Sequence, residues 1–291
     1  TISDLYKYIF KSDGKRLRAK LSLVTSSINR RKNKKRIRLA AIIELLHTAT
    51  LVHDDVVDES QTRRGAKSVN SLWSNAHGVL IGDYIYSKAF ILMVEIGESK
   101  ILHELANATN DISKGELIQL DALQNLSINL KQLEDISYFK TGRLFEASAR
   151  TGAILAGGET SFINNVSKCA KYMGVLFQVK DDLLDYSIKE DVIGKPIFQD
   201  MKEGKVTYPF YFAYKNADKN DKAKLKTYLG KNKFNIEKVY NLIHQLNGIK
   251  ETELLASKYL NKATTAANSI KNKHIKEEML KLINSALYRK K

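Results

Sequence analysis

Residues 51–65 read LVHDDVVDESQTRRG, and residues 177–185 read FQVKDDLLD. Each stretch contains the pattern D-D-x-x-D inside an apolar segment whose periodicity is typical of an α-helix. Residues 37–58, which lead into and include the first cluster, follow a 3.6-residue period, and no alternating pattern of useful length predicts a strand. The two stretches therefore predict a helical protein whose acidic groups lie on helices.

The same helical periodicity continues along the chain. Further helices are predicted at about residues 78–96, 99–123, 131–156, 160–187, 236–246 and 279–286. Gly157-Gly158 predicts a break between two of them, and the absence of proline from residues 1–195 favours long uninterrupted helices. We therefore expect one all-α domain over residues 1–291, built as a single bundle of ten or more long antiparallel helices.

The charge of the chain restricts its partners. The formal net charge is +16, which favours an anionic partner such as nucleic acid, anionic lipid or a diphosphate. The densest basic run, residues 30–36, is interpreted as a loop between two helices. Because no zinc-ligand spacing or aromatic interleaving accompanies it, we expect no nucleic-acid partner.

The cellular setting is predicted from what the sequence lacks. Its one cysteine, Cys169, excludes an internal disulfide and fits a reducing compartment, so we expect a cytoplasmic protein. No apolar stretch is long enough for a membrane-spanning helix, and the first residues do not form a secretory signal.

The two acidic clusters predict a metal site. Residues four apart lie roughly 40° apart around a helix axis, so Asp54 shares a face with Asp58, and Asp181 with Asp185. Neighbouring carboxylates raise each other's pKa unless cations neutralise them, and oxygen ligands of this kind suit Mg²⁺. A solvated helix end would explain one cluster, but two clusters flanked by apolar residues indicate walls around a metal-bridged diphosphate.

Cationic residues near the first cluster could hold phosphate directly. Arg63 and Arg64 follow it, and Lys15 and Arg18 lie in residues 14–18, GKRLR. His47 precedes Asp54 by two helical turns and falls on the same stripe. A packed core histidine is an equally good interpretation of that position.

In these motifs the chain resembles the trans-isoprenyl diphosphate synthases, specifically the octaprenyl-like polyprenyl branch. The resemblance extends from about Gly14 to Tyr211. It includes GKRLR (14–18), LVHDDVVDESQTRRG (51–65), LIGDYIYSKAF (80–90), GELIQL (115–120), KTGRLFEA (140–147), FQVKDDLLD (177–185) and GKPIFQDMKEGKVTYP (194–209). It implies the isoprenoid synthase fold, in which the helices surround a deep central cavity, and a homodimer.

The resemblance also implies residue roles. Three Mg²⁺ ions on the allylic diphosphate would be held by Asp54, Asp55, Asp58, Asp181 and Asp185. The same diphosphate would be bound by Arg63, Lys140, Lys195 and Lys205, and isopentenyl diphosphate by Lys15, Arg18, His47 and Arg64. Thr141 and Gln178 match positions that line the reacting carbons and stabilise positive charge.

The activity implied is the addition of isopentenyl diphosphate to an allylic diphosphate such as farnesyl or geranylgeranyl diphosphate. The product length is argued from the wall before the first cluster, where Ala49 and Thr50 are small and favour a product near eight units. A second layer at Tyr84, Leu120 or Leu123 could close the tunnel earlier. Asp121 stands where the octaprenyl-like pattern has a large apolar residue, and Ala19 replaces a common proline.

Four alternatives remain beside this interpretation. A short-chain farnesyl or geranylgeranyl diphosphate synthase would share the motifs. A non-catalytic subunit of a heteromeric synthase usually loses acidic residues, a terpene cyclase has a mixed second metal motif, and a basic nucleic-acid-binding protein is favoured by net charge alone. Peripheral membrane contact for release of an apolar product is a further hypothesis.

Overall fold

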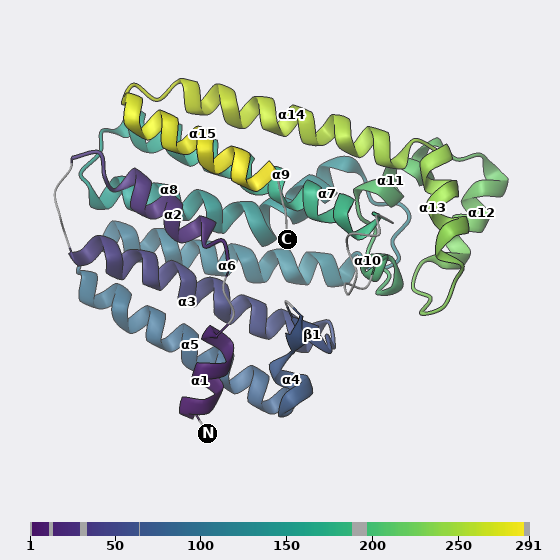
Figure 1. Cartoon of the computed structure of the whole chain (residues 1–291), viewed down its shortest axis with the longest axis horizontal. Coiled ribbons are helices and arrows are strands. Elements are labelled where there is room, and N and C mark those ends of the chain that lie inside the picture. The colour runs from purple at the N-terminus through teal and green to yellow at the C-terminus, as the bar shows by residue number, and fades with distance from the viewer. Residues whose placement is uncertain (1, 12–13, 30–33, 64, 188–196, 288–291) are drawn as a thin grey trace. The chain divides into compact units, whose positions relative to one another are not determined.

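The computed structural model describes residues 2–11, 14–29, 34–63, 65–187 and 197–287 (Figure 1). Apart from one short antiparallel pair, its regular elements are helices. The pair consists of β1 (Thr62–Arg63) and β2 (Ala66–Lys67). The prediction of an all-α protein is confirmed for the described part of the chain.

The helices predicted between residues 37 and 187, and the one at 236–246, lie close to their predicted positions, whereas the last helix begins at Lys273, before residue 279, and several helices, including the long Gly248–Asn268, were not predicted. They are α1 (Ile2–Phe10), α2 (Leu17–Thr25), α3 (Lys34–Val57), α4 (Val69–Leu72), α5 (Asn75–Ile96), α6 (Ser99–Asp121), α7 (Leu130–Ser137), the π-helix η1 (Tyr138–Gly142), α8 (Arg143–Leu155), α9 (Thr160–Asp185), α10 (Gln199–Lys202), α11 (Tyr208–Asn216), α12 (Lys219–Tyr228), α13 (Ile236–Gln245), α14 (Gly248–Asn268) and α15 (Lys273–Leu287). The predicted break at Gly157-Gly158 separates α8 from α9, and Gly157 has a φ of 66°. The one interruption that periodicity did not predict is η1, which lies within the expected helix 131–156.

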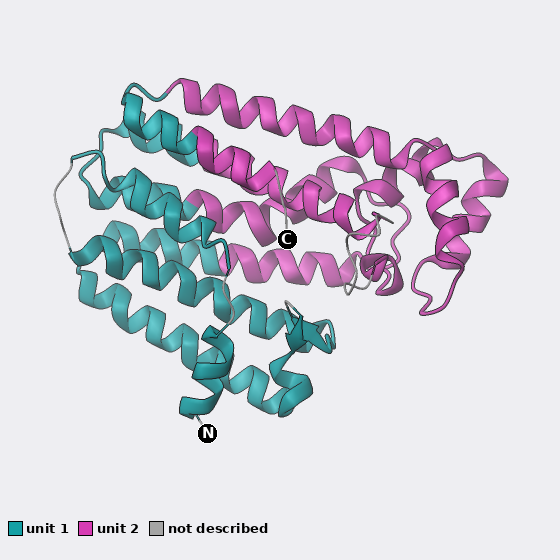
Figure 2. Cartoon of the chain, in the orientation of Figure 1, with its two compact units in different colours: residues 1–109, 147–167, 270–279 teal, residues 110–146, 168–269, 280–291 magenta. Residues whose placement is uncertain are grey.

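The structure divides into two compact units, each of which combines segments that are distant in the sequence (Figure 2). Unit 1 comprises Thr1–Thr109, Ala147–Ser167 and Ile270–Met279. Unit 2 comprises Asn110–Glu146, Lys168–Ser269 and Leu280–Lys291. The expectation of one domain over 1–291 stays a prediction.

Unit 1 is organised around α3. This helix packs against α5 and α2, and its buried face consists of residues at helical spacing, including Leu39, Ile42, Ile43 and Leu46. Ser74 caps the start of α5 by accepting from the amide of His77, and α5 ends at a glycine in the left-handed conformation. The packing fixes α3 along its length and therefore fixes the position of the acidic cluster at its C-terminal end.

Unit 2 contains the C-terminal parts of α6, α9 and α15, the segment from α7 to the first turn of α8, and the helices α10 to α14. The side chains of Phe145, Phe198, Tyr208 and Phe210 are almost completely buried in it. A capping box of Asn129 and Gln132 begins α7. No helix among the described residues is long and apolar enough to cross a bilayer.

Candidate active site

The first acidic cluster lies at the C-terminal end of α3. Although α3 ends at Val57, the amide of Asp58 donates to the carbonyl of Asp54 at 2.8 Å, so the turn continues through the cluster. Asp54 and Asp58 are partly buried, whereas Asp55 is 4% exposed. The middle carboxylate is therefore the most buried of the three.

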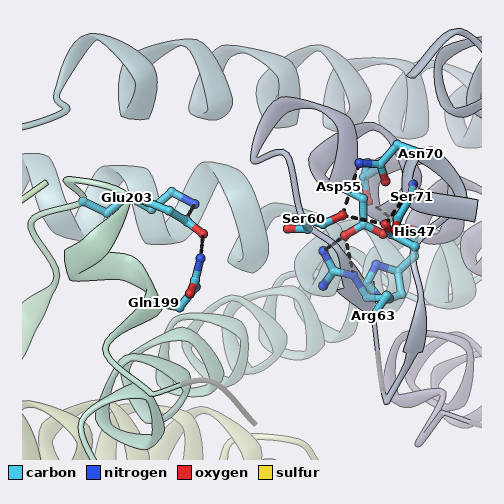
Figure 3. A network of polar contacts seen from close by, with 11 residues as sticks. His47, Asp55, Ser60, Arg63, Asn70, Ser71, Gln199 and Glu203 are labelled. Carbon is cyan, nitrogen blue, oxygen red and sulfur yellow. Dashed lines mark hydrogen bonds and ion pairs between the residues drawn. The ribbon is translucent and has the colours of Figure 1, made fainter. Parts of the chain in front are cut away.

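Asp55 is held by Arg63, which lies on β1 (Figure 3). Nε and Nη2 of Arg63 donate to Oδ1 of Asp55 at 2.8 and 2.5 Å. Burial raises the pKa of Asp55, while the hydrogen bond and charge of Arg63 act in the opposite direction. Burial alone would lower the pKa of Arg63, but the hydrogen bond and negative charge of Asp55 raise it. The two groups predicted as metal ligand and phosphate-binding cation therefore neutralise each other here.

The loop that begins at Ser60 is hydrogen-bonded to the last turn of α3. The amide of Ser60 donates to the carbonyl of Asp55 at 2.9 Å, and the carbonyl of Ser60 accepts from Ser68 Oγ and Asn70 Nδ2 (Figure 3). Glu59, between cluster and loop, has a φ of 50°. A left-handed conformation is unfavourable for a residue with a side chain, so these hydrogen bonds stabilise a strained turn.

The GKRLR segment supplies a second polar group in unit 1. Arg16 has a φ of 47° and precedes the first residue of α2, and Arg18 lies within that helix. Nη1 of Arg18 is 3.0 Å from Nε2 of His47 on α3. Because a guanidinium can only donate, His47 accepts through Nε2 as a neutral imidazole. The structure thus brings together two of the predicted isopentenyl diphosphate ligands, while Lys15 is exposed.

The second acidic cluster forms the last turn of α9, in unit 2. Asp181 is exposed and Asp185 partly buried, whereas Asp182 is 4% exposed. Asp182 accepts from Gln178 Nε2 at 2.9 Å and from the amide of Tyr208 at 3.4 Å. Burial raises its pKa, and the charge of Asp200 acts in the same direction. As in the first cluster, the middle aspartate is the most buried of the three.

Asp185 and Asp200 form an acidic pair that the sequence analysis missed. The carboxylate of Asp185 accepts from the amides of Gln199 and Asp200, the first residues of α10, at 2.9 and 3.2 Å. Burial, followed by the charge of Asp200, raises the pKa of Asp185; burial also raises that of Asp200, against the effect of Lys205. Two carboxyl groups whose pKa values are raised in this way would favour a divalent cation. The sequence signal was weak, because Asp200 lies outside any D-D-x-x-D pattern.

The π-helix η1 presents Lys140 and Thr141. Nζ of Lys140 contacts Glu116 Oε2 at 2.8 Å and also donates to Gln119, while Thr141 Oγ1 donates to Gln178 Oε1 at 2.7 Å. Single-turn π segments inside longer helices are frequent at functional sites. The two counter-groups on α6, Glu116 and Gln119, were not predicted from sequence.

Glycines on two neighbouring helices pack closely against the π-helix η1. A Cβ on Gly115 would lie 2.7 Å from Phe139 Cβ, and one on Gly174 would lie 2.6 Å from Gly142 Cα. Both distances are shorter than real carbon contacts, so only glycine permits this approach.

Three predicted phosphate-binding cations remain, and the structure describes one of them. Lys205 is 2.8 Å from Glu203, which also accepts from Gln199 (Figure 3). Arg64 and Lys195 lie outside the described residues. The roles of all predicted site residues stay predictions.

The residues expected to control product length lie in varied surroundings. Ala49 is fully buried in an apolar cluster of unit 1, and Thr50 donates to the carbonyl of His47 at 2.7 Å. Tyr84 is 37% exposed and meets Tyr6 edge to face. In unit 2, Leu120 and Leu123 are exposed. Their part in product length stays a prediction.

Comparisons with known proteins identify the family. The family model described as polyprenyl synthetase matches residues 1–246. The chain belongs to the polyprenyl synthetase family. Among its relatives, the octaprenyl diphosphate synthase of Escherichia coli is 33% identical over 290 residues, which cover 99% of this chain and 90% of that protein.

Solved structures of polyprenyl synthetases have the same fold. A decaprenyl diphosphate synthase from Rhodobacter capsulatus matches with a TM-score of 0.92 and 32% identity, covering 98% of this chain and 89% of that one. A polyprenyl synthase from Caulobacter crescentus, complexed with calcium and isoprenyl diphosphate, matches with a TM-score of 0.92 and 31% identity, covering 99% and 88%. The prediction of a trans-prenyltransferase with the isoprenoid synthase fold is confirmed at the level of the family.

Proposed function

We propose that this polyprenyl synthetase condenses isopentenyl diphosphate with an allylic diphosphate of the farnesyl or geranylgeranyl type, and that its product is near octaprenyl diphosphate. The observation that carries the proposal is the shared construction of the two acidic clusters. In each, the middle aspartate is hydrogen-bonded to the scaffold and is the most buried of the three, and in the second cluster Asp185 also accepts from two backbone amides. The less buried outer carboxylates of both clusters suit an enzyme that must hold a diphosphate through cations.

The donor set fits magnesium. Asp54 and Asp58 in unit 1, and Asp181 and Asp185 in unit 2, offer the carboxylate oxygens that this ion prefers. No three acidic, histidine or cysteine groups in the described ranges already form a complete metal site. Magnesium commonly takes one or two carboxylates and completes its shell with water and substrate phosphates, so a complete protein cage is not required. We propose three ions per active site; when bound, they neutralise the leaving diphosphate.

The protein's own cations have complementary tasks. Arg63, Lys140 and Lys205, with Lys195, bind the allylic diphosphate and stabilise charge as the C–O bond breaks. Each of the three described cations already has an acidic partner: Asp55, Glu116 or Glu203. These acids hold the cationic side chains in place before substrate arrives, so that little reorganisation is needed.

Other side chains bind isopentenyl diphosphate and stabilise the allylic carbocation. Arg18 and His47, with Lys15 and Arg64, hold isopentenyl diphosphate so that its double bond attacks the allylic cation. Thr141 and Gln178 present oxygen atoms to the positive charge. The departed diphosphate accepts the proton that the new bond releases. Water must be excluded because it would quench the cation.

Product length follows from the small residues Ala49 and Thr50. With no large side chain there, the growing chain passes the first cluster, and a floor at Tyr84, Leu120 or Leu123 would stop it earlier. The names of the relatives, which include octaprenyl and decaprenyl synthases, support a long product. A short-chain synthase and a non-catalytic subunit of a heteromeric synthase are the alternatives.

The test is direct. Purified protein is incubated with Mg²⁺, labelled isopentenyl diphosphate and farnesyl diphosphate, and the dephosphorylated products are sized by chromatography. A dominant product near eight isoprene units supports the whole proposal, and one of three or four units refutes the product length alone. Folded wild-type protein that incorporates no label, with excess chelator as the blank, refutes the activity and favours the non-catalytic subunit.

Two further properties belong to the proposal. We propose a homodimer in the cytoplasm that contacts membranes peripherally when it releases product. Sedimentation equilibrium tests the dimer, and a protein mass equal to one chain at micromolar concentration refutes it. Flotation with anionic liposomes, with and without the allylic substrate, tests the membrane contact, and protein that stays at the bottom in both refutes it.

A further inference from the structure

A chain of hydrogen bonds runs through unit 2 from Thr141 to the start of α11. Thr141 Oγ1 donates to Gln178 Oε1 at 2.7 Å, and Gln178 Nε2 donates to Asp182 Oδ1 at 2.9 Å. The amide of Tyr208 donates to the second oxygen, Oδ2, at 3.4 Å. Thr141, Asp182 and Tyr208 are buried, and Gln178 is partly buried. This relay of hydrogen bonds, from Thr141 through Gln178 and Asp182 to Tyr208, therefore links the π-helix, two successive turns of α9 and the first residue of α11.

The direction of this relay depends on Asp182. A glutamine amide has an oxygen at one end and an NH₂ group at the other, and the two orientations have nearly the same shape. Both oxygens of Asp182 accept N–H groups here, Oδ1 from Gln178 Nε2 and Oδ2 from the amide of Tyr208. Gln178 must then turn its NH₂ group toward Asp182 and its oxygen toward Thr141. The hydroxyl hydrogen of Thr141 is consequently directed at Gln178, which leaves the lone pairs of Thr141 for another partner.

We infer that Asp182 is a positioning residue that sets the polarity of this relay, so that Thr141 and Gln178 present oxygen lone pairs to the allylic cation. The inference rests on the proposed prenyl transfer. In the opposite polarity, the hydroxyl hydrogen of Thr141 would be free to point at the cation and would destabilise it. A dipole fixed in advance within a water-poor site stabilises a charged transition state without reorganisation.

Asp182 is thereby distinguished from its neighbours in the second cluster. Asp181 is exposed, and Asp185 accepts from the start of α10. Asp182 is buried, and its hydrogen bonds lead to Thr141 rather than to the accessible end of the cluster. The middle carboxylate acts through Gln178, whereas the outer two are the proposed metal ligands.

The first experiment is a double-mutant cycle on Asp182→Asn and Thr141→Val. Asparagine has one acceptor oxygen for two N–H donors, so the amide of Gln178 loses its single orientation, and we expect kcat to fall by about tenfold or more. In the Thr141→Val background, where the hydrogen-bond chain ends at Gln178, Asp182→Asn should lower kcat by a smaller factor than it does in the wild-type background. Full additivity of the two losses would overturn the inference, as would an unchanged kcat in the single variant.

Controls separate this role from metal binding and from packing. The Mg²⁺ concentration for half-maximal rate, and the Kd for a non-ionising allylic thiodiphosphate, should stay within about twofold of wild type in Asp182→Asn. Asp181→Asn should instead raise the Mg²⁺ requirement. Asp182→Glu, which keeps a carboxylate, should recover part of the lost kcat. A raised Mg²⁺ requirement in Asp182→Asn would assign Asp182 to the metal site and reject the positioning role.

A second measurement does not depend on any variant folding. Neutron diffraction from deuterated wild-type crystals locates the deuterium atoms of the relay. We expect the Thr141 deuterium to point at Gln178 Oε1 and the amide deuterium atoms to point at Asp182. A deuterium on Asp182 Oδ1, or an amide turned the other way, overturns the inference. Wild-type protein that makes no prenyl product refutes the proposed function, whereas active wild type with a reversed relay refutes only the polarity.

Discussion

The backbone of α9 at Gly174 packs very closely against Gly142 of η1, and this contact allows a quantitative prediction. Gly174 on α9 lies one turn before Gln178, and Gly142 directly follows Thr141. A Cβ added at Gly174 would lie 2.6 Å from Gly142 Cα and 3.0 Å from Phe145 Cβ. The substitution Gly174→Ala therefore forces backbone, and not only a flexible side chain, to move.

The size of the effect follows from these distances. Carbon atoms pack at about 3.5–4.0 Å, so the two segments must separate by about 1 Å. Overpacking of this kind costs about 1–3 kcal/mol, and the higher helix propensity of alanine offsets about 1 kcal/mol of it. The bond from Thr141 to Gln178, now 2.7 Å, would lengthen beyond hydrogen-bonding distance. A misplacement of about 1 Å at a reacting centre costs about a hundredfold in rate.

We therefore expect Gly174→Ala to lower kcat by about a hundredfold while the free energy of unfolding falls by only about 0–2 kcal/mol. Initial rates with saturating substrates and urea unfolding measure the two quantities. Gly158→Ala is the matched control, because its Cβ would meet Phe162 Cδ1 at 2.8 Å and the carbonyl oxygen of Ala153 at 3.0 Å, both in unit 1 and away from η1. It should lower stability with kcat within about twofold of wild type. Wild-type kcat in Gly174→Ala, or a loss that follows the unfolded fraction, would refute this reasoning.

Three further predictions concern other contacts. Burial raises the pKa of the Cys169 thiol to about 12, so the native protein should not react with a disulfide reagent, while denatured protein should give one thiol per chain; native reactivity would contradict this. Arg63→Met, measured by urea unfolding with chelator present, should cost about 1–3 kcal/mol because it leaves the Asp55 carboxylate buried without its partner; adding Asp55→Asn should restore most of the loss. Gly82→Ala would place a Cβ 2.2 Å from His53 Nε2 and should cost about 1–3 kcal/mol; if His53→Ala fails to relieve that cost, the imidazole is not its cause.

The fold was largely predictable from the sequence because apolar spacing reports which face of a helix is buried. Periodicity placed the helix of the first cluster at 37–58, and the structure has it at Lys34–Val57. The helix of the second cluster was expected at 160–187 and is observed at Thr160–Asp185. Periodicity gave no warning of η1, since one extra residue in a turn shifts the apolar phase too little to be noticed within a long amphipathic run.

The site was predictable in its chemical groups but not in its pairings. Helical geometry placed the middle aspartate of each cluster on a different side from the outer two, and the middle ones are the most buried. The pairing of Asp55 with Arg63 depends on the short hairpin of β1 and β2, and that of Asp185 with Asp200 on the start of α10. Both bring together residues that no helical spacing relates, so the sequence could not disclose them.

The buried middle aspartate is stabilised in both acidic clusters, but by different groups. In unit 1 a cation on a strand neutralises Asp55, and in unit 2 neutral N–H donors from Gln178 and Tyr208 hold Asp182. Three ionised carboxylates within two helical turns would repel one another, and binding the middle one to the scaffold gives that group its own compensation. The outer carboxylates, one turn apart, are less buried than the middle one in both clusters. With the outer carboxylates as the proposed metal ligands, substitutions at the middle and outer positions should differ in their effect on the requirement for metal.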